Sequence, residues 1–222
     1  MTQRQIDRRL GQVDETLAQM AGLVAKAIAL AVAGLKEPHP DLGAEARAIE
    51  EEVDSLDDAL EQDCQELMAL NAPVARDLRR LMGVMRVTLL LEDLGDEAES
   101  VARRGRFLAR HAVVPRPPAL LELADRVYHL YQQACVVVKT GDPALAREIF
   151  AAKPAASELG RHASAALAQS IRSDGDHAAE WSHLLRATER LRTMLERCKE
   201  LTEEGYFLHH GTSVRHHHEK LA

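Results

Sequence analysis

The chain has 222 residues, of which 46% are hydrophobic and only 3% aromatic, and its formal net charge at pH 7 is −7. This acidity and the scarcity of aromatic side chains argue against nucleic-acid binding, which needs a basic surface and platforms for base stacking. Long segments rich in Leu, Val, Ala and Met, separated by short clusters of Gly and Pro, predict an all-α protein.

Apolar residues at spacings of three and four predict three long helices in the first half of the chain. The first covers about residues 3–36 and ends before Pro38 and Pro40, which cannot continue a helix. The second covers about residues 41–70, and its polar side is heavily acidic. The third follows an Asn-Ala-Pro turn at 71–73 and runs to about His111. Its last turns are basic, as suits a helix C-terminus, with Arg103, Arg104, Arg106 and Arg110.

A proline-rich linker at residues 113–118 separates these helices from a second set of three. The second set covers about 119–139, then 142–170 with a kink at Pro154, and then 176–208. Asp142 is expected to cap the middle one of these helices.

The two halves are weakly similar, because the sequence GRFL at 105–108 corresponds to GYFL at 205–208. A duplicated three-helix bundle explains this match. We therefore predict two tandem three-helix repeats, six long helices in all. The predicted boundaries are 1–112 for the first repeat, 113–118 for the linker, 119–210 for the second repeat and 211–222 for a disordered tail.

Two pairs of carboxylates are spaced by four residues, Glu50 with Asp54 and Glu92 with Asp96. This spacing puts each pair on one helix face, so two antiparallel helices would present four carboxylates to one patch. Oxygen-only ligation suits hard cations such as Mg²⁺, Ca²⁺ or Mn²⁺, and iron is also compatible. The plain alternative is a solvated face, because this spacing is common in any acidic helix.

The second pair carries an additional signal, because an apolar stripe leads directly to it. The stripe consists of Leu78, Leu81, Met85 and Leu89. Continuing the same steps gives Glu92 and Asp96, so we expect these carboxylates where core residues are due. Buried carboxylates cost several kcal/mol unless they are paired or bind metal.

These motifs resemble those of the PhoU family, regulators of phosphate uptake built from two repeated three-helix bundles. The resemblance covers essentially the whole chain. It is carried by EEEVD at 50–54, PVARDLR at 73–79 and EDLGD at 92–96. Similar family members bind metal clusters on these carboxylate faces, which implies Glu50, Asp54, Glu92 and Asp96 as metal ligands.

The resemblance further implies a cytoplasmic, non-enzymatic regulator that acts as an adaptor between a phosphate ABC transporter and a sensor histidine kinase. Such adaptors repress the phosphate-starvation response when phosphate is plentiful. Recognition would occur between helix faces, with the acidic ridge of 41–70 and the basic end of the next helix as docking candidates. Family precedent also favours a homodimer.

The second repeat departs from the family pattern. Aligning the repeats places Lys153 and Ser157 at the positions of the first pair, and Arg192 and Glu196 at those of the second. Cations at two of these four positions should repel a metal ion. We therefore predict that this second site is lost and replaced by an ion-pair or hydrogen-bond cluster, so that divalent or iron cations bind the first repeat only.

Two other classes of protein compete with the regulator. A carboxylate-bridged metalloenzyme would need Glu-x-x-His motifs on two facing helices, and the chain has one such spacing, Glu180 with His183, without a second copy. A purely structural dimer module fits everything except carboxylates in an apolar stripe. The histidines at 209–210 and 216–218 are expected to belong to a solvated tail, since a flexible segment offers no fixed geometry.

Three isolated cysteines form neither a CxxC pair nor a disulfide framework, which favours a reducing compartment. No apolar core of a signal peptide follows Met1. The longest apolar run, residues 27–35, is far shorter than the roughly 20 residues that span a bilayer. We therefore expect a cytoplasmic protein with no transmembrane segment, which associates with membranes only peripherally.

Overall fold

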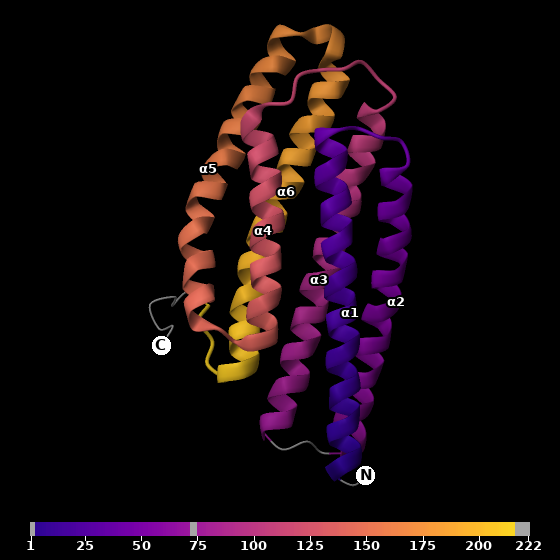
Figure 1. The fold of residues 1–222 in the computed structure, drawn as a ribbon, viewed down its shortest axis with the longest axis vertical. Helices are drawn as coiled ribbons and strands as arrows, with labels where there is room; N and C mark the ends of the chain where they lie inside the picture. The colour runs from indigo at the N-terminus through magenta and orange to yellow at the C-terminus, as the bar shows by residue number, and fades with distance from the viewer. Residues whose placement is uncertain (1–2, 72–74, 216–222) are drawn as a thin grey trace.

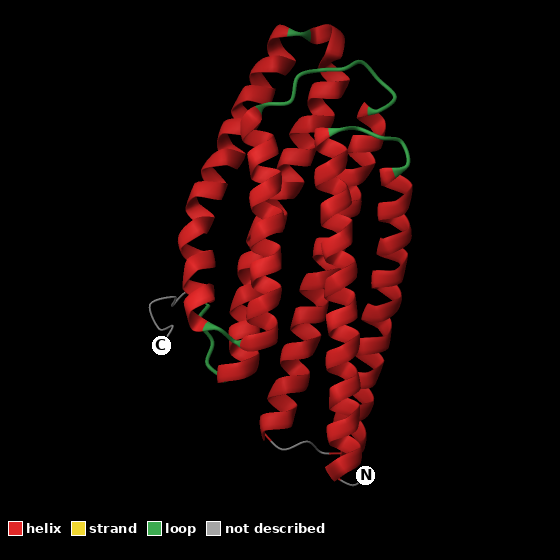
Figure 2. Cartoon of the chain, viewed as in Figure 1, coloured by secondary structure: helices red, strands yellow, loops and turns green. Residues whose placement is uncertain are grey.

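The computed structural model describes residues 3–71 and 75–215. Over these residues the chain forms helices and loops with no strand (Figure 2). The six helices are α1 (Gln3–Lys36), α2 (Leu42–Asn71), α3 (Ala75–Leu108), α4 (Pro118–Thr140), α5 (Pro143–Ser173) and α6 (Ala178–His210), with a short 3₁₀ helix, η1 (Gly175–His177), before α6. The all-α prediction of six long helices is confirmed. The predicted turn at Ala72 and Pro73 and the histidines at 216–218 lie outside the described residues.

The helices form two groups of three that lie side by side with nearly parallel long axes (Figure 1). Helices α1, α2 and α3 pack on one another, and so do α4, α5 and α6. The groups meet where α3 packs along α6 and where α1 packs against α4. Buried apolar residues of both groups belong to one continuous core. Helices α3 and α6 therefore join the two groups along one seam, and α1 and α4 join them along another.

Local sequence explains where the helices of the second group begin and end. The Asp142 carboxylate accepts hydrogen bonds from the backbone N–H groups of Ala144 and Leu145 at 2.8 and 3.2 Å. Pro143 occupies the first turn, where its missing N–H costs nothing. Pro154 does not interrupt α5, which continues through it along a curved path (Figure 1).

Glycines allow close helix packing at equivalent points of the two repeats. A β-carbon on Gly105 of α3 would lie 2.9 Å from the carbonyl oxygen of Gly34 in α1. A β-carbon on Gly205 of α6 would lie 2.7 Å from the backbone nitrogen of Val138 in α4. The sequence match between GRFL and GYFL therefore reflects the same physical need, a backbone-to-backbone contact that leaves no room for a side chain.

The predicted core stripe of α3 is wrong. Leu89 is 60% exposed and Leu78 is 38% exposed, whereas Leu81 is buried. The buried residues instead form a broad face that includes Leu81, Val84, Val87, Thr88, Leu91, Leu94, Ala98, Val101 and Ala102. Glu92 and Asp96 do continue the row that contains Leu89, but that row lies at the outer edge of the core. Spacing alone located the row correctly and could not tell which of two adjacent rows faces the neighbouring helices.

The segments at both ends of the second group are anchored to the bundle. In the linker, Val114 is buried and the Arg116 Nε donates a 2.8 Å hydrogen bond to the carbonyl oxygen of Leu35. After α6, Val214 is fully buried and Arg215 forms a 2.5 Å ion pair with the buried Glu204. At the start of the predicted tail, Val214 and Arg215 therefore contact the bundle, whereas Thr212 and Ser213 are exposed. The predicted boundary at residue 211 stays a prediction.

Helix α1 is long and apolar enough, by length and composition, to cross a membrane, and it is the one such helix among the described residues. The longest uninterrupted apolar run had suggested that no segment would meet this test. Half of its most apolar 18-residue window is buried in the bundle, and Met20, Val24 and Ile28 have no exposed surface. The composition of α1 is therefore that of a central core helix.

The glycine contacts predict opposite effects of two Gly-to-Ala substitutions. Gly205→Ala forces a methyl group into the backbone of α4 and should destabilise the protein by about 1–3 kcal/mol through overpacking. Gly22→Ala is the matched control, because nothing lies within 4 Å of its added methyl group. It should stabilise by up to about 1 kcal/mol through helix propensity. Urea unfolding measures the free energy of unfolding of both variants. Equal changes in the two variants would contradict the close contact of Gly205 with the backbone of α4.

Candidate metal centre

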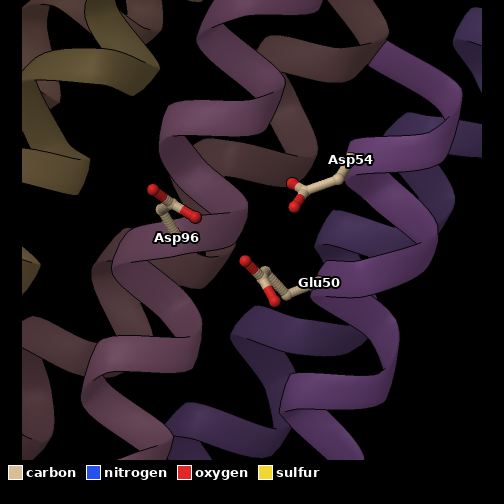
Figure 3. A group of neighbouring side chains, drawn as sticks. All are labelled: Glu50, Asp54 and Asp96. Carbon is tan, nitrogen blue, oxygen red and sulfur yellow. The ribbon is translucent and has the colours of Figure 1, made fainter. Parts of the chain in front are cut away.

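Three of the four predicted carboxylates meet on the outer surface of the first repeat. Glu50 and Asp54 project from α2 and Asp96 projects from α3, toward one another across the gap between these helices (Figure 3). One oxygen from each residue lies within 4.8 Å of the corresponding oxygens of the other two. Glu50 is half-buried, whereas Asp54 and Asp96 are exposed. The sequence motifs on two separate helices therefore form one cluster in space.

Glu92 does not belong to this group of three, although it lies close enough to interact with it. Burial first, and then the negative charges of Asp96, Asp93, Asp57 and Asp54, raise the pKa of Glu92 from its ordinary 4.5 to about 7. Its carboxyl group is therefore partly protonated near neutral pH in the metal-free protein. The structure thus brings three of the four predicted carboxylates into one group, with Glu92 close enough to interact with it, and metal binding by the four stays a prediction.

Neighbouring carboxylates also perturb the cluster itself. Burial raises the pKa of Glu50, and the charges of Asp54, Asp96 and Glu99 raise it further. Burial, followed by the charges of Asp54, Asp93 and Glu99, likewise raises the pKa of Asp96. In each case a carboxylate of one helix repels carboxylates of the other. The carboxylates of the cluster therefore repel one another in the folded protein, and a bound cation would relieve this repulsion.

These repulsions show that the acidic face between the antiparallel helices α2 and α3 extends beyond the four predicted carboxylates. Glu50 interacts with Glu99, and Glu92 interacts with Asp57 at the other end of the same face. Sequence reasoning missed Asp57 and Glu99 as members of the face. Both lie three residues beyond the predicted pairs, so continuing the helical steps of three and four would have found them.

Three other carboxylates of α3 have arginine partners. Asp93 pairs with Arg197 at 3.1 Å, and Glu97 pairs with Arg190 at 3.1 Å. Glu99 lies 3.8 Å from Arg103. In contrast, none of the four predicted ligands has a Lys, Arg or His partner within 4.0 Å among residues 3–71 and 75–215. The four are Glu50, Asp54, Glu92 and Asp96.

The donor set fits a hard cation. It offers carboxylate oxygens only, with no His or Cys in the group of three. Such oxygens suit Mg²⁺, Ca²⁺, Mn²⁺ or iron rather than a soft metal. The three carboxylates leave coordination positions for water or for an oxygen of another molecule. A cation here would cancel the repulsion across α2 and α3 and fix the two helices relative to each other.

The corresponding face of the second repeat has different chemistry. Lys153 of α5 pairs with Glu196 of α6, with a distance of 2.6 Å between Nζ and Oε1. Arg192 does not neutralise Glu196; it pairs with Glu189 at 2.8 Å instead. The stem of Arg192 packs over Gly160, where an added β-carbon would lie 2.8 Å from its Cγ. The ammonium and guanidinium groups stand where the first repeat presents carboxylates, and Ser157 supplies no charge.

Comparison with known proteins identifies relatives of the chain. The PhoU domain model matches residues 17–105, within the half that retains the carboxylate cluster. The phosphate-specific transport system accessory protein PhoU homolog of Pseudomonas putida is 25% identical over 214 residues, which cover 96% of this chain and 84% of that protein. The homolog of the same description from Deinococcus radiodurans is 31% identical over 113 residues, 51% of this chain and 53% of that protein.

Two crystal structures have the same fold. PhoU from Pseudomonas aeruginosa matches with a TM-score of 0.88 at 24% identity, over 93% of this chain and 99% of that chain. The phosphate transport system regulatory protein PhoU from Streptococcus pneumoniae matches with a TM-score of 0.83 at 16% identity, over 94% and 99%. Residues 17–105 therefore belong to the PhoU family, and over almost its whole length the chain is similar to a PhoU accessory protein. These comparisons support a regulatory protein of this family rather than a carboxylate-bridged metalloenzyme.

The raised pKa of Glu92 predicts how stability depends on pH in metal-free protein. The folded state holds the Glu92 proton up to a pH of about 7, whereas the unfolded state releases it near 4.5. Stability from this group is therefore lost as the pH rises from about 4.5 to about 7. Glu92→Gln removes this loss, so it should raise the melting temperature clearly at pH 8 and little at pH 5.

Thermal unfolding at both pH values measures this difference. Glu45→Gln, which removes an exposed carboxylate outside the cluster, controls for a general effect of net charge. An equal effect of Glu92→Gln at pH 5 and at pH 8 would show that Glu92 is not held in a repulsive, partly buried site.

Proposed function

We propose that this member of the PhoU family is an accessory regulator of a phosphate-specific transport system. The observation that carries the proposal is similarity over almost the whole chain to proteins described in those terms. We place it in the cytoplasm, where it acts as an adaptor between the ATPase of a phosphate ABC transporter and a sensor histidine kinase. In this role it represses the phosphate-starvation response when phosphate is plentiful.

Recognition of both partners takes place through helix faces. The chain offers two outer surfaces of opposite charge on adjoining parts of α2 and α3. One is the acidic face that contains Glu50, Asp54 and Asp96, and the other is the basic end of α3. Charged surfaces of this kind set the orientation and the rate of protein association more than its strength. The acidic face is the proposed docking surface for a partner, with a metal ion as part of it.

A divalent or iron cation binds at Glu50, Asp54 and Asp96, with Glu92 completing the acidic surroundings. The cation stiffens the α2–α3 pair by removing the repulsion between the two helices. It also exposes a positive centre to which a carboxylate or phosphate of a partner protein can bind. The second repeat binds no metal, because Lys153 already neutralises Glu196 there.

The protein works as a homodimer. Support comes from the row of apolar side chains on the outer side of α3, where Leu78, Met82 and Leu89 are 38%, 45% and 60% exposed. A second copy of the chain would remove these side chains from water. Each buried CH₂ group contributes roughly 0.8 kcal/mol to such an association.

The test is complementation of a strain that lacks the chromosomal gene, with a phosphate-starvation promoter as the reporter. The unaltered chain should restore repression in high phosphate and should co-purify with the transporter ATPase or the histidine kinase. Failure of both readouts would contradict the regulator role.

The same strain tests the metal site with a matched pair of variants. Asp54→Asn/Asp96→Asn removes two of the three proposed ligands, whereas Glu51→Gln/Glu52→Gln removes the same charge from exposed positions outside the group. Titration calorimetry with Mn²⁺ should show binding to the unaltered chain and to the second variant, and none to the first. Repression should follow the same order. Equal Mn²⁺ binding by both variants would refute the site.

A further inference from the structure

A basic pocket lies where the end of α3 meets the first turns of α6, away from the acidic cluster. Its volume is about 400 Å³. Five arginines line it: Arg103, Arg104 and Arg106 from α3, Arg110 from the turn that follows α3, and Arg186 from α6. The chain as a whole carries a net charge of −7, so five cations in one small pocket are a strong local departure from its average.

Four of these five arginines form no ion pair within the described part of the chain, although the negative charge of Glu97 acts on Arg104. Arg104, Arg106, Arg110 and Arg186 have no carboxylate within 4.0 Å among the described residues, and Arg103 has only Glu99 at 3.8 Å. Other arginines of α6 are different, because each of them pairs with a carboxylate at 2.7–3.1 Å. These are Arg190, Arg192 and Arg197. The pocket therefore concentrates positive charge that the surrounding chain leaves unbalanced, and such a concavity attracts anions.

The innermost arginine is held in place at an energetic cost. Arg104 is only 9% exposed, and its Nη1 donates to the carbonyl oxygen and, at 2.6 Å, to the hydroxyl oxygen of Ser100. Its Nε is buried and has no hydrogen-bond acceptor. Burying a guanidinium group is expensive unless its charge and its N–H groups are satisfied. An unsatisfied donor on a buried cation that lines a pocket is the expected state of an anion site without its anion.

A stack of three rings forms the rigid wall of the pocket. Phe107 lies between His111 and His183, with ring centroids 3.7 and 3.6 Å apart and planes inclined by 14° and 5°. The Nδ1 of His183 is buried and also lacks a partner. Burial, followed by the charges of Arg104, Arg186 and His111, lowers the pKa of His183. His183 is therefore neutral near pH 7 and offers one ring nitrogen as a hydrogen-bond donor without adding a sixth charge.

We propose that this pocket binds a small anion that contains at least two linked phosphate groups. A single phosphate carries about two negative charges and would leave most of the five guanidinium groups unbalanced. Guanidinium groups bind phosphate oxygens in pairs of parallel hydrogen bonds, so four or five of them match the oxygens of a diphosphate or triphosphate. A volume of about 400 Å³ is typical of a site for a small ligand. Inorganic pyrophosphate and the phosphate tail of a nucleotide share this chemistry.

The test is titration calorimetry on the full chain at pH 7.5, freed of metal and then dialysed free of chelator. The titrants are inorganic phosphate, pyrophosphate, tripolyphosphate, ADP and poly-glutamate. Pyrophosphate and tripolyphosphate should bind at least about tenfold more tightly than phosphate, because each additional phosphate group adds charged hydrogen bonds to the guanidinium groups. ADP that binds more tightly than pyrophosphate would identify a nucleotide as the source, and equal affinity would identify the diphosphate group alone.

Matched variants locate the binding. Arg110→Gln/Arg186→Gln removes two exposed pocket arginines and should weaken pyrophosphate binding at least about tenfold, since two charged contacts are lost. Arg126→Gln/Arg161→Gln removes the same charge from exposed positions outside the pocket and should leave the affinity unchanged. Arg104→Lys keeps the buried charge but loses the forked donor, and should also weaken binding if its melting temperature shows a folded protein.

Three results would overturn the proposal. One is absence of pyrophosphate and tripolyphosphate binding by the unaltered chain. Another is an equal loss of binding in the Arg110/Arg186 and Arg126/Arg161 variants, which would show attraction by net charge alone. The third is tighter binding of poly-glutamate than of pyrophosphate, which would make the pocket a docking point for an acidic protein segment.

Discussion

Repulsion between carboxylates across the antiparallel helices α2 and α3 is the constraint on which the rest of the first repeat depends. The helices are held together by the core beneath, where Gly95 of α3 allows close contact with Val53 of α2. That packing fixes Asp96 opposite Glu50 and Asp54, so the charges cannot separate without a loss of core contacts. The chain supplies no cation to this group among its described residues. A bound metal ion or added protons would relieve the repulsion that remains between these carboxylates.

The second repeat contains the corresponding helix pair, α5 and α6, without a cluster of unpaired carboxylates among its described residues. The second repeat keeps the lengths of its second and third helices, 31 and 33 residues against 30 and 34 in the first repeat. It also keeps a close glycine contact, that of α6 with α4, yet it neutralises its corresponding face with Lys153. The two faces therefore lie on corresponding helices and carry side chains of different chemistry. Fold and packing do not require the acidic cluster, and this contrast supports a separate purpose for the carboxylates of the first repeat. The PhoU domain match, confined to residues 17–105, follows the same division.

Much of the fold follows from local sequence, because helix period, proline breaks and the Asp142 cap act over a few residues. The error over Leu89 arose because two adjacent rows of α3 are both apolar, and only the neighbouring helices decide which row is buried. Three carboxylates of the candidate site were predicted by spacing, whereas the place of Glu92 beside them depends on how α2 and α3 are aligned. The ring stack of Phe107 with His183 joins residues 76 positions apart, which no local pattern reveals.

Helix α3 thus carries the acidic cluster in its middle and the basic pocket at its end, while its inner face joins both repeats. The central claim, that one repeat binds metal and the other does not, is tested most directly by crystals of the chain soaked in Mn²⁺. Anomalous density is expected between Glu50, Asp54 and Asp96, with none beside Lys153 and Glu196. Density at the second face, or its absence at the first under saturating Mn²⁺, would contradict the account.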